Sequence, residues 1–184
     1  MGTVAKLVNA SLPVVIAQYS RDDYGAGQEE FLHWALMVIV KRGSLEGPTW
    51  HAIDKHRPDG QVFWERAYLP KASLLRTSKC IGLVQIGIVK ARDLKSFISV
   101  VGSGDPSTGH PVSPSFQGWR CKDWVLEVIE IIRETEGWID ESVLAPGRPA
   151  TREVFYPALR RVAQATQQAR QSDPRSPPSV EWIE

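Results

Sequence analysis

The spacing of apolar positions along the chain has one period in the first part of the sequence and another in the second. In the first part, short apolar and β-branched runs lie between turn-forming residues, a pattern that predicts strands. The predicted strands cover residues 12–19, 33–40, 49–54, 62–68 and 81–89. Gly82 and Gly87 in the last strand indicate a bulge or a close approach of another backbone segment. The run at 33–40 is apolar on both faces, which predicts a central strand.

After residue 90 the apolar positions recur with the helical period. Helices are predicted over residues 91–101, 121–136 and 151–170, and the strongest carries an apolar stripe that includes Val125 and Ile132. A strand-rich first part and a helical second part predict an α+β fold, with an antiparallel sheet of about five strands packed against helices. We expect residues 1–171 to form a single globular domain and the Pro/Ser-rich residues 172–184 to be a disordered tail.

Composition excludes several classes of protein and sets no strong electrostatic preference. The 184 residues carry 22 Lys and Arg against 21 Asp and Glu, so bulk charge does not favour nucleic acid or an anionic membrane as a partner. No apolar run approaches the ~20 residues that a membrane-spanning helix needs. Two cysteines, Cys80 and Cys121, do not indicate a disulfide scaffold, so we expect a reduced cytoplasmic protein.

Cys121 is the candidate nucleophile because it begins the strongest predicted helix. Free N–H groups in the first turn of a helix stabilise a thiolate, and a nearby imidazole can accept the thiol proton. His33 begins an apolar strand and is the candidate base. The alternative interpretation is that Cys121 is a small core residue, since it shares helical spacing with Val125 and Ile132. The long Gly/Pro/Ser-rich stretch at 102–118 precedes the cysteine and is a candidate lid.

Which second histidine accompanies His33 depends on strand register. In a simple hairpin that pairs Val40 with Thr49, His56 lies opposite His33. A one-residue bulge reverses the faces and brings His51 to the side of His33 instead. Both registers are compatible with the sequence.

The fragments "HWALMVIV", "PTWHAIDK" and "RCKDWVLEVI" resemble the permuted papain-like thiol enzymes of the NlpC superfamily, in particular the lecithin:retinol acyltransferase-like group. The resemblance spans roughly residues 31–132 and is closer still to a family of small fungal proteins without assigned activity. It implies a permuted papain-like fold with Cys121 as nucleophile, His33 as general base and His51 as the residue that orients the base. Arg120 stands where that group has an asparagine.

Three functions follow from these residues. The first is a cysteine-dependent hydrolase or acyltransferase acting on an amide, ester or thioester of a small molecule or peptide. The second is a non-catalytic binding module on the same fold, and the third is a non-covalent cyclase or isomerase in a fungal biosynthetic pathway. We expect no cofactor, and no metal because local ligand spacing is absent. The residues expected to line the substrate pocket are Trp34, Trp50, Trp119 and Trp124.

Overall fold

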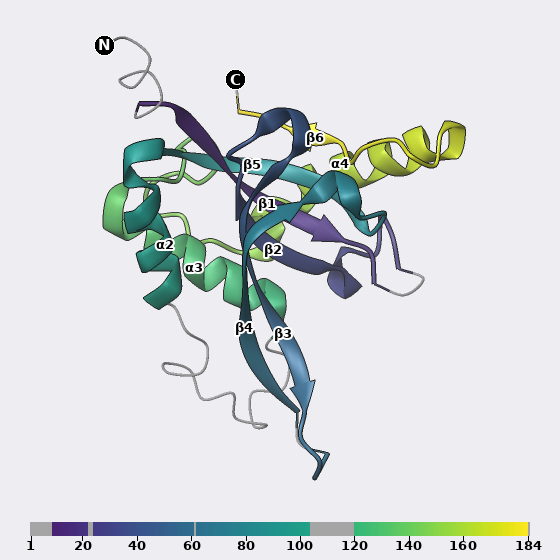
Figure 1. Cartoon of the computed structure of the whole chain (residues 1–184), viewed down its shortest axis with the longest axis horizontal. Helices are drawn as coiled ribbons and strands as arrows, with labels where there is room; N and C mark the ends of the chain where they lie inside the picture. Colours follow the sequence, from purple (N-terminus) through teal and green to yellow (C-terminus); the bar gives the residue numbers. More distant parts are fainter. Residues whose placement is uncertain (1–8, 22–23, 61, 104–119, 184) are drawn as a thin grey trace.

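A six-stranded sheet packed with three helices makes up the described part of this computed structural model (Figure 1). The structure describes residues 9–21, 24–60, 62–103 and 120–183. The strands are β1 (Ser11–Tyr19), β2 (His33–Val38), β3 (Glu46–His56), β4 (Val62–Ser73), β5 (Cys80–Lys90) and β6 (Val180–Glu181). The helices are α2 (Leu94–Ser103), α3 (Cys121–Glu136) and α4 (Arg152–Ser172). The predicted α+β class and largely antiparallel sheet are confirmed, with one strand more than expected.

The sheet has the order β4-β3-β2-β1-β5-β6, and only the β5–β6 pair is parallel. β2 therefore has three strands on one side and two on the other. This central position explains why its side chains are buried on both faces. The bulge predicted near Gly87 is also present, because the register between β1 and β5 shifts beside it and Gly87 bridges to Ile139.

The two faces of β2 contribute to two separate apolar clusters. Trp34, Leu36 and Val38 belong to the larger cluster, which contains side chains of all three helices. Met37 and Ile39 belong to a smaller cluster with Leu74 and Cys80 and with Trp182 packed against it. The helices thus cover one face of the sheet, because alternate residues of a strand point to opposite faces.

The C-terminal segment is not the disordered tail that its composition predicts. Val180 and Glu181 form β6 beside Leu83 and Val84, and the Leu83 N–H donates to the Ser179 carbonyl over 2.9 Å. Two arginines of α4 hold the segment in place. Arg161 pairs with Glu181 at 2.7 Å, and Arg170 donates to the carbonyls of Ser176, Ser78 and Cys80. Pro/Ser-rich composition does not reveal these partners, since they come from distant parts of the sequence.

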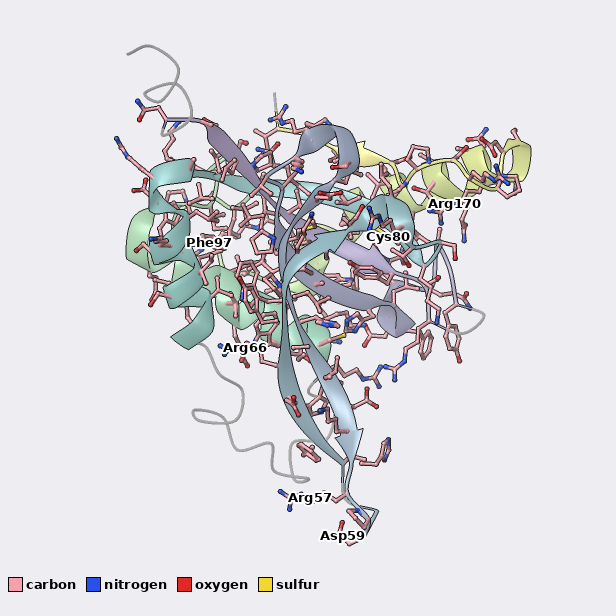
Figure 2. All side chains as sticks on the ribbon, in the orientation of Figure 1. Arg57, Asp59, Arg66, Cys80, Phe97 and Arg170 are labelled. Atoms are coloured by element: carbon pink, nitrogen blue, oxygen red, sulfur yellow. The ribbon has the colours of Figure 1, made fainter. Side chains whose placement is uncertain are left out.

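The β3–β4 hairpin extends beyond the rest of the sheet (Figure 1). Arg57 and Asp59 lie at its tip, and Phe97 of α2 lies far from them beside the sheet (Figure 2). Both strands are longer than predicted, with β3 beginning at Glu46 and β4 continuing to Ser73. Most of the candidate lid falls in residues 104–119, outside the described part of the chain.

Candidate active site

His33 and His51 lie in direct contact on two neighbouring strands, His33 at the start of β2 and His51 in the middle of β3. The pairs Leu36–Trp50 and Met37–Thr49 set the register of β2 against β3, and this register brings His51 to the same face as His33. His33 Nε2 and His51 Nδ1 are 2.8 Å apart. His56 is instead an exposed side chain at the end of β3, 4.0 Å from Asp54. Thr49 pairs with Met37 and not with Val40, a shift of three residues from the simple hairpin, and because the shift is odd it swaps the faces and selects His51.

Both imidazoles are held in their neutral form. Burial lowers the pKa of His33 to about 4, and the neighbouring His51 and the charge of Arg21 add to this effect, while Asp54 opposes it. Burial also lowers the pKa of His51. At neutral pH one ring therefore donates the shared proton and the other accepts it, as the contact distance requires.

The histidine pair borders a half-open pocket of about 360 Å³, called here the histidine pocket. Its walls combine an apolar surface on β2, β3 and β4 with charged side chains at one end. The lining residues are Tyr19, Ser20, Arg21, His33, Ala35, Thr49, His51, Ile53, Asp54, Leu69 and Lys79.

Cys121 is the first residue of α3, as predicted, and only 3% of its surface is exposed. Burial raises the pKa of its thiol. Hydrogen bonds from the backbone at Trp34 and Lys122, and the charges of Lys122 and Arg21, act in the opposite direction. The bond to Trp34 places the sulfur beside the residue that follows His33 in β2. No hydrogen bond joins the thiol to an imidazole among the residues described here.

The thiol borders a second pocket of about 350 Å³, called here the thiol pocket. Arg21 and Asp54 line both this pocket and the histidine pocket, so the two cavities adjoin at these side chains. The lining residues are Arg21, Tyr24, Glu30, Phe31, Leu32, Asp54, Val62, Trp64, Arg120, Cys121 and Lys122. No sequence pattern singles out Arg21, which lies in a turn-rich polar stretch.

A charge network fixes the start of α3 against a short 3-10 turn, Glu29–Phe31. Lys122 is fully buried, and its ammonium donates to the carbonyls of Glu29 and Glu30. Arg152 of α4 binds both Asp123, at 2.6 Å, and Glu30, at 2.7 Å. Two further α4 side chains complete the network, with Tyr156 bound to Glu30 and Arg160 to Glu29. The basic side chains of α4 therefore hold the Glu29–Phe31 turn, whose carbonyls accept from Lys122, the residue next to Cys121.

The tryptophans expected at the pocket have another role in the structure. Trp34, Trp50 and Trp124 are at most 1% exposed and lie in the large core cluster, and none of them lines either pocket. The indole rings fill the space between the sheet and the helices, and the expectation that they contact substrate stays a prediction. Trp119 falls outside the described residues.

Other kinds of site find little support in the described residues. His, Cys, Asp and Glu side chains there do not gather in any group of three or more that could hold a metal ion. No helix in that part of the chain is long and apolar enough to cross a membrane. Comparison of the sequence with protein-family models and with curated proteins, and comparison with solved structures, gives no match.

Proposed function

We propose that the protein is a cysteine-dependent hydrolase or acyltransferase in which Cys121 is the nucleophile, His33 the general base and His51 the residue that orients the base. The observation that carries the proposal is the His33–His51 contact of 2.8 Å, next in the chain to Trp34, whose backbone hydrogen-bonds to the helix-start thiol. A base held by a second polar residue is the arrangement that activates thiol nucleophiles. The adjoining pockets support the same assignment.

The hydrogen bond between the imidazoles determines which nitrogen can act as the base. If His33 Nε2 carries the proton and donates it to His51 Nδ1, the Nδ1 atom of His33 is left with a free lone pair. This tautomer is the one that can accept the thiol proton. The role of His51 is therefore to select it.

The reaction requires the thiol and the imidazole to come within hydrogen-bond distance when substrate binds. Catalytic contacts are often longer in a free enzyme and shorten in the complex. The sulfur already contacts the backbone of Trp34, and the charge of Arg21 lowers the pKa of both groups, which favours the Cys121 thiolate and disfavours protonated His33. When substrate displaces water, the charge of Arg21 is less screened, and it therefore stabilises the Cys121 thiolate more strongly.

The proposed reaction is an acyl transfer through a covalent acyl-enzyme at Cys121. Cys121 loses its proton to His33, and the resulting thiolate forms a carbon–sulfur bond to the substrate carbonyl. His33 returns the proton to the departing alcohol, thiol or amine as that bond breaks. Water or an amine then attacks the acyl-enzyme, losing a proton to His33, and the Cys121 thiolate leaves and is reprotonated.

Intact-mass measurement after incubation with acyl N-acetylcysteamine thioesters tests the proposal. The wild-type protein should gain one acyl group, mapped to Cys121 by peptide analysis, and release the free thiol. Cys121→Ser should abolish this adduct, and His33→Ala should slow its formation by ~100-fold or more. His56→Ala is the matched control, because that imidazole is exposed and outside the pair. Absence of any Cys121 adduct with acetyl, butanoyl and benzoyl donors would refute the proposal.

A second candidate is favoured by the burial of Cys121 and its raised thiol pKa. In this alternative, the histidine pair performs acid–base chemistry on a ligand in the histidine pocket and the thiol takes no covalent part. Turnover that persists in Cys121→Ser but is lost in His33→Ala would select this candidate.

A further inference from the structure

We propose that the thiol pocket takes the acyl part of an aryl carboxylic acid derivative, with its ring against Phe31 and Tyr24 and its carboxyl oxygens beside Arg21 and Arg120. This inference names a substrate class for the site and so rests on the proposed function. The binding step itself needs no reaction at Cys121 and can be measured separately.

Aromatic side chains gather at the mouth of this pocket and are exposed there. Phe31 and Tyr24 are 48% and 37% exposed, and their rings stack with centroids 4.5 Å apart. Val62, also exposed, and Trp64 line the same cavity. Exposure of aromatic rings to water is unfavourable in the free protein, and a ligand ring that covers them removes this apolar surface from water. The apolar part of the pocket therefore suits a planar group.

Two guanidinium groups beside the thiol supply the polar part of recognition. The side chains of Arg21 and Arg120 are 50% and 46% exposed, and both line the thiol pocket. Their side-chain contacts are long: Arg21 lies 3.4 Å from Asp54, and Arg120 lies 3.5 Å from the Glu30 backbone carbonyl and 3.9 Å from its carboxylate. Guanidinium N–H groups in such weak contacts can turn to a carboxylate or to the oxyanion that forms when the thiolate attacks.

The acidic groups in the same pocket do not cancel this preference. Glu30 is already bound by Arg152, Tyr156 and Lys122, which lowers its pKa and compensates its charge. Among the described residues, Asp54 is the carboxylate that contacts Arg21, at the boundary of the two pockets. The pocket volume of about 350 Å³ exceeds the ~150 Å³ of a cavity that holds benzene, so a ring and a short acyl link fit.

Calorimetric titration of the wild-type protein with benzoate and cyclohexanecarboxylate tests the inference. The two acids share charge and approximate size, and only benzoate has a planar ring. We expect benzoate to bind at least ~10-fold more tightly, and Phe31→Ala to remove this preference. Leu75→Ala is the matched control, because Leu75 is comparably exposed and lies outside the pocket. Arg120→Gln should weaken both acids equally and keep the ring preference.

Equal affinities for the two acids, or a ring preference that survives Phe31→Ala, would overturn the inference. A parallel experiment compares benzoyl and cyclohexanecarbonyl thioesters as acyl donors to Cys121. Equal acylation together with equal binding would leave the proposed function and reject the aryl site. Preferential benzoate binding without any acylation would support the aryl site and reject the proposed thiol chemistry.

Discussion

The neutral histidine pair predicts that folding stability falls as the pH drops through the range between the unfolded and folded pKa values of His33. The pKa of His33 falls from an ordinary 6.5 to about 4 in the folded protein. The unfolded chain therefore binds the proton more readily, and protonation favours unfolding as the pH decreases. Each pKa unit corresponds to ~1.4 kcal/mol, so the full difference is about 3 kcal/mol, an upper value because the ring borders an open pocket.

Urea unfolding at several pH values measures this effect. Between pH ~7.5 and pH ~4.5, His33 should account for a loss of about 2.5 kcal/mol in the free energy of unfolding. In His33→Gln, the free energy of unfolding should fall by about 2.5 kcal/mol less than in wild type over the same pH range. His56→Gln should keep the wild-type slope, since that side chain is exposed. The reasoning is refuted if wild type and His33→Gln have parallel curves, or if NMR shows the His33 ring titrating near pH 6.5.

Three further substitutions test the packing around the site, each by the free energy of unfolding. Lys122→Met should lower the free energy of unfolding by about 2 kcal/mol, because two backbone carbonyls lose their buried donor. The control Lys95→Met, at an exposed position, should change it by less than ~0.5 kcal/mol. Equal effects of the two substitutions would contradict the role of Lys122 as a buried donor. Gly87→Ala should cost about 2 kcal/mol or more since a Cβ there would overlap a backbone carbonyl, and Gly43→Ala, which has open space, should be nearly neutral. Gln18→Met should raise the free energy of unfolding by about 1 kcal/mol, because the amide nitrogen and oxygen of this buried side chain lack a hydrogen-bond partner in the described structure. A loss of stability would show that these atoms have a partner.

Local patterns were sufficient for most of the fold. The β-branched runs and the helical stripe of Val125 and Ile132 place the strands and α3 correctly, because each of these patterns reflects burial of one face. The helix start at Cys121 was also predictable, since the apolar period begins there. The tail was not predictable, because β6 depends on contacts with β5 and α4 rather than on its own composition.

The candidate site was predictable in its residues and less so in its geometry. His33, His51 and Cys121 could be selected from residue type and position, but the choice between His51 and His56 required the register of β2 and β3. The core positions of Trp34, Trp50 and Trp124 were not predictable, because a tryptophan fills a core as readily as it lines a cavity. Arg21 was not found and the burial of Lys122 was not expected, since charged residues in a polar turn or at a helix start usually face solvent.

The ties between Glu29–Phe31 and α4 also bear on the order in which the protein matures during synthesis. Arg152 and Arg160 reach Glu30 and Glu29 across 122 and 131 residues of sequence. A nascent chain emerging from the ribosome can pair β1, β2 and β3 long before α4 has been made. The histidine pair can therefore form early, whereas the segment beside the thiol is fastened only after α4 has been made, so the two parts of the candidate site are completed at different times.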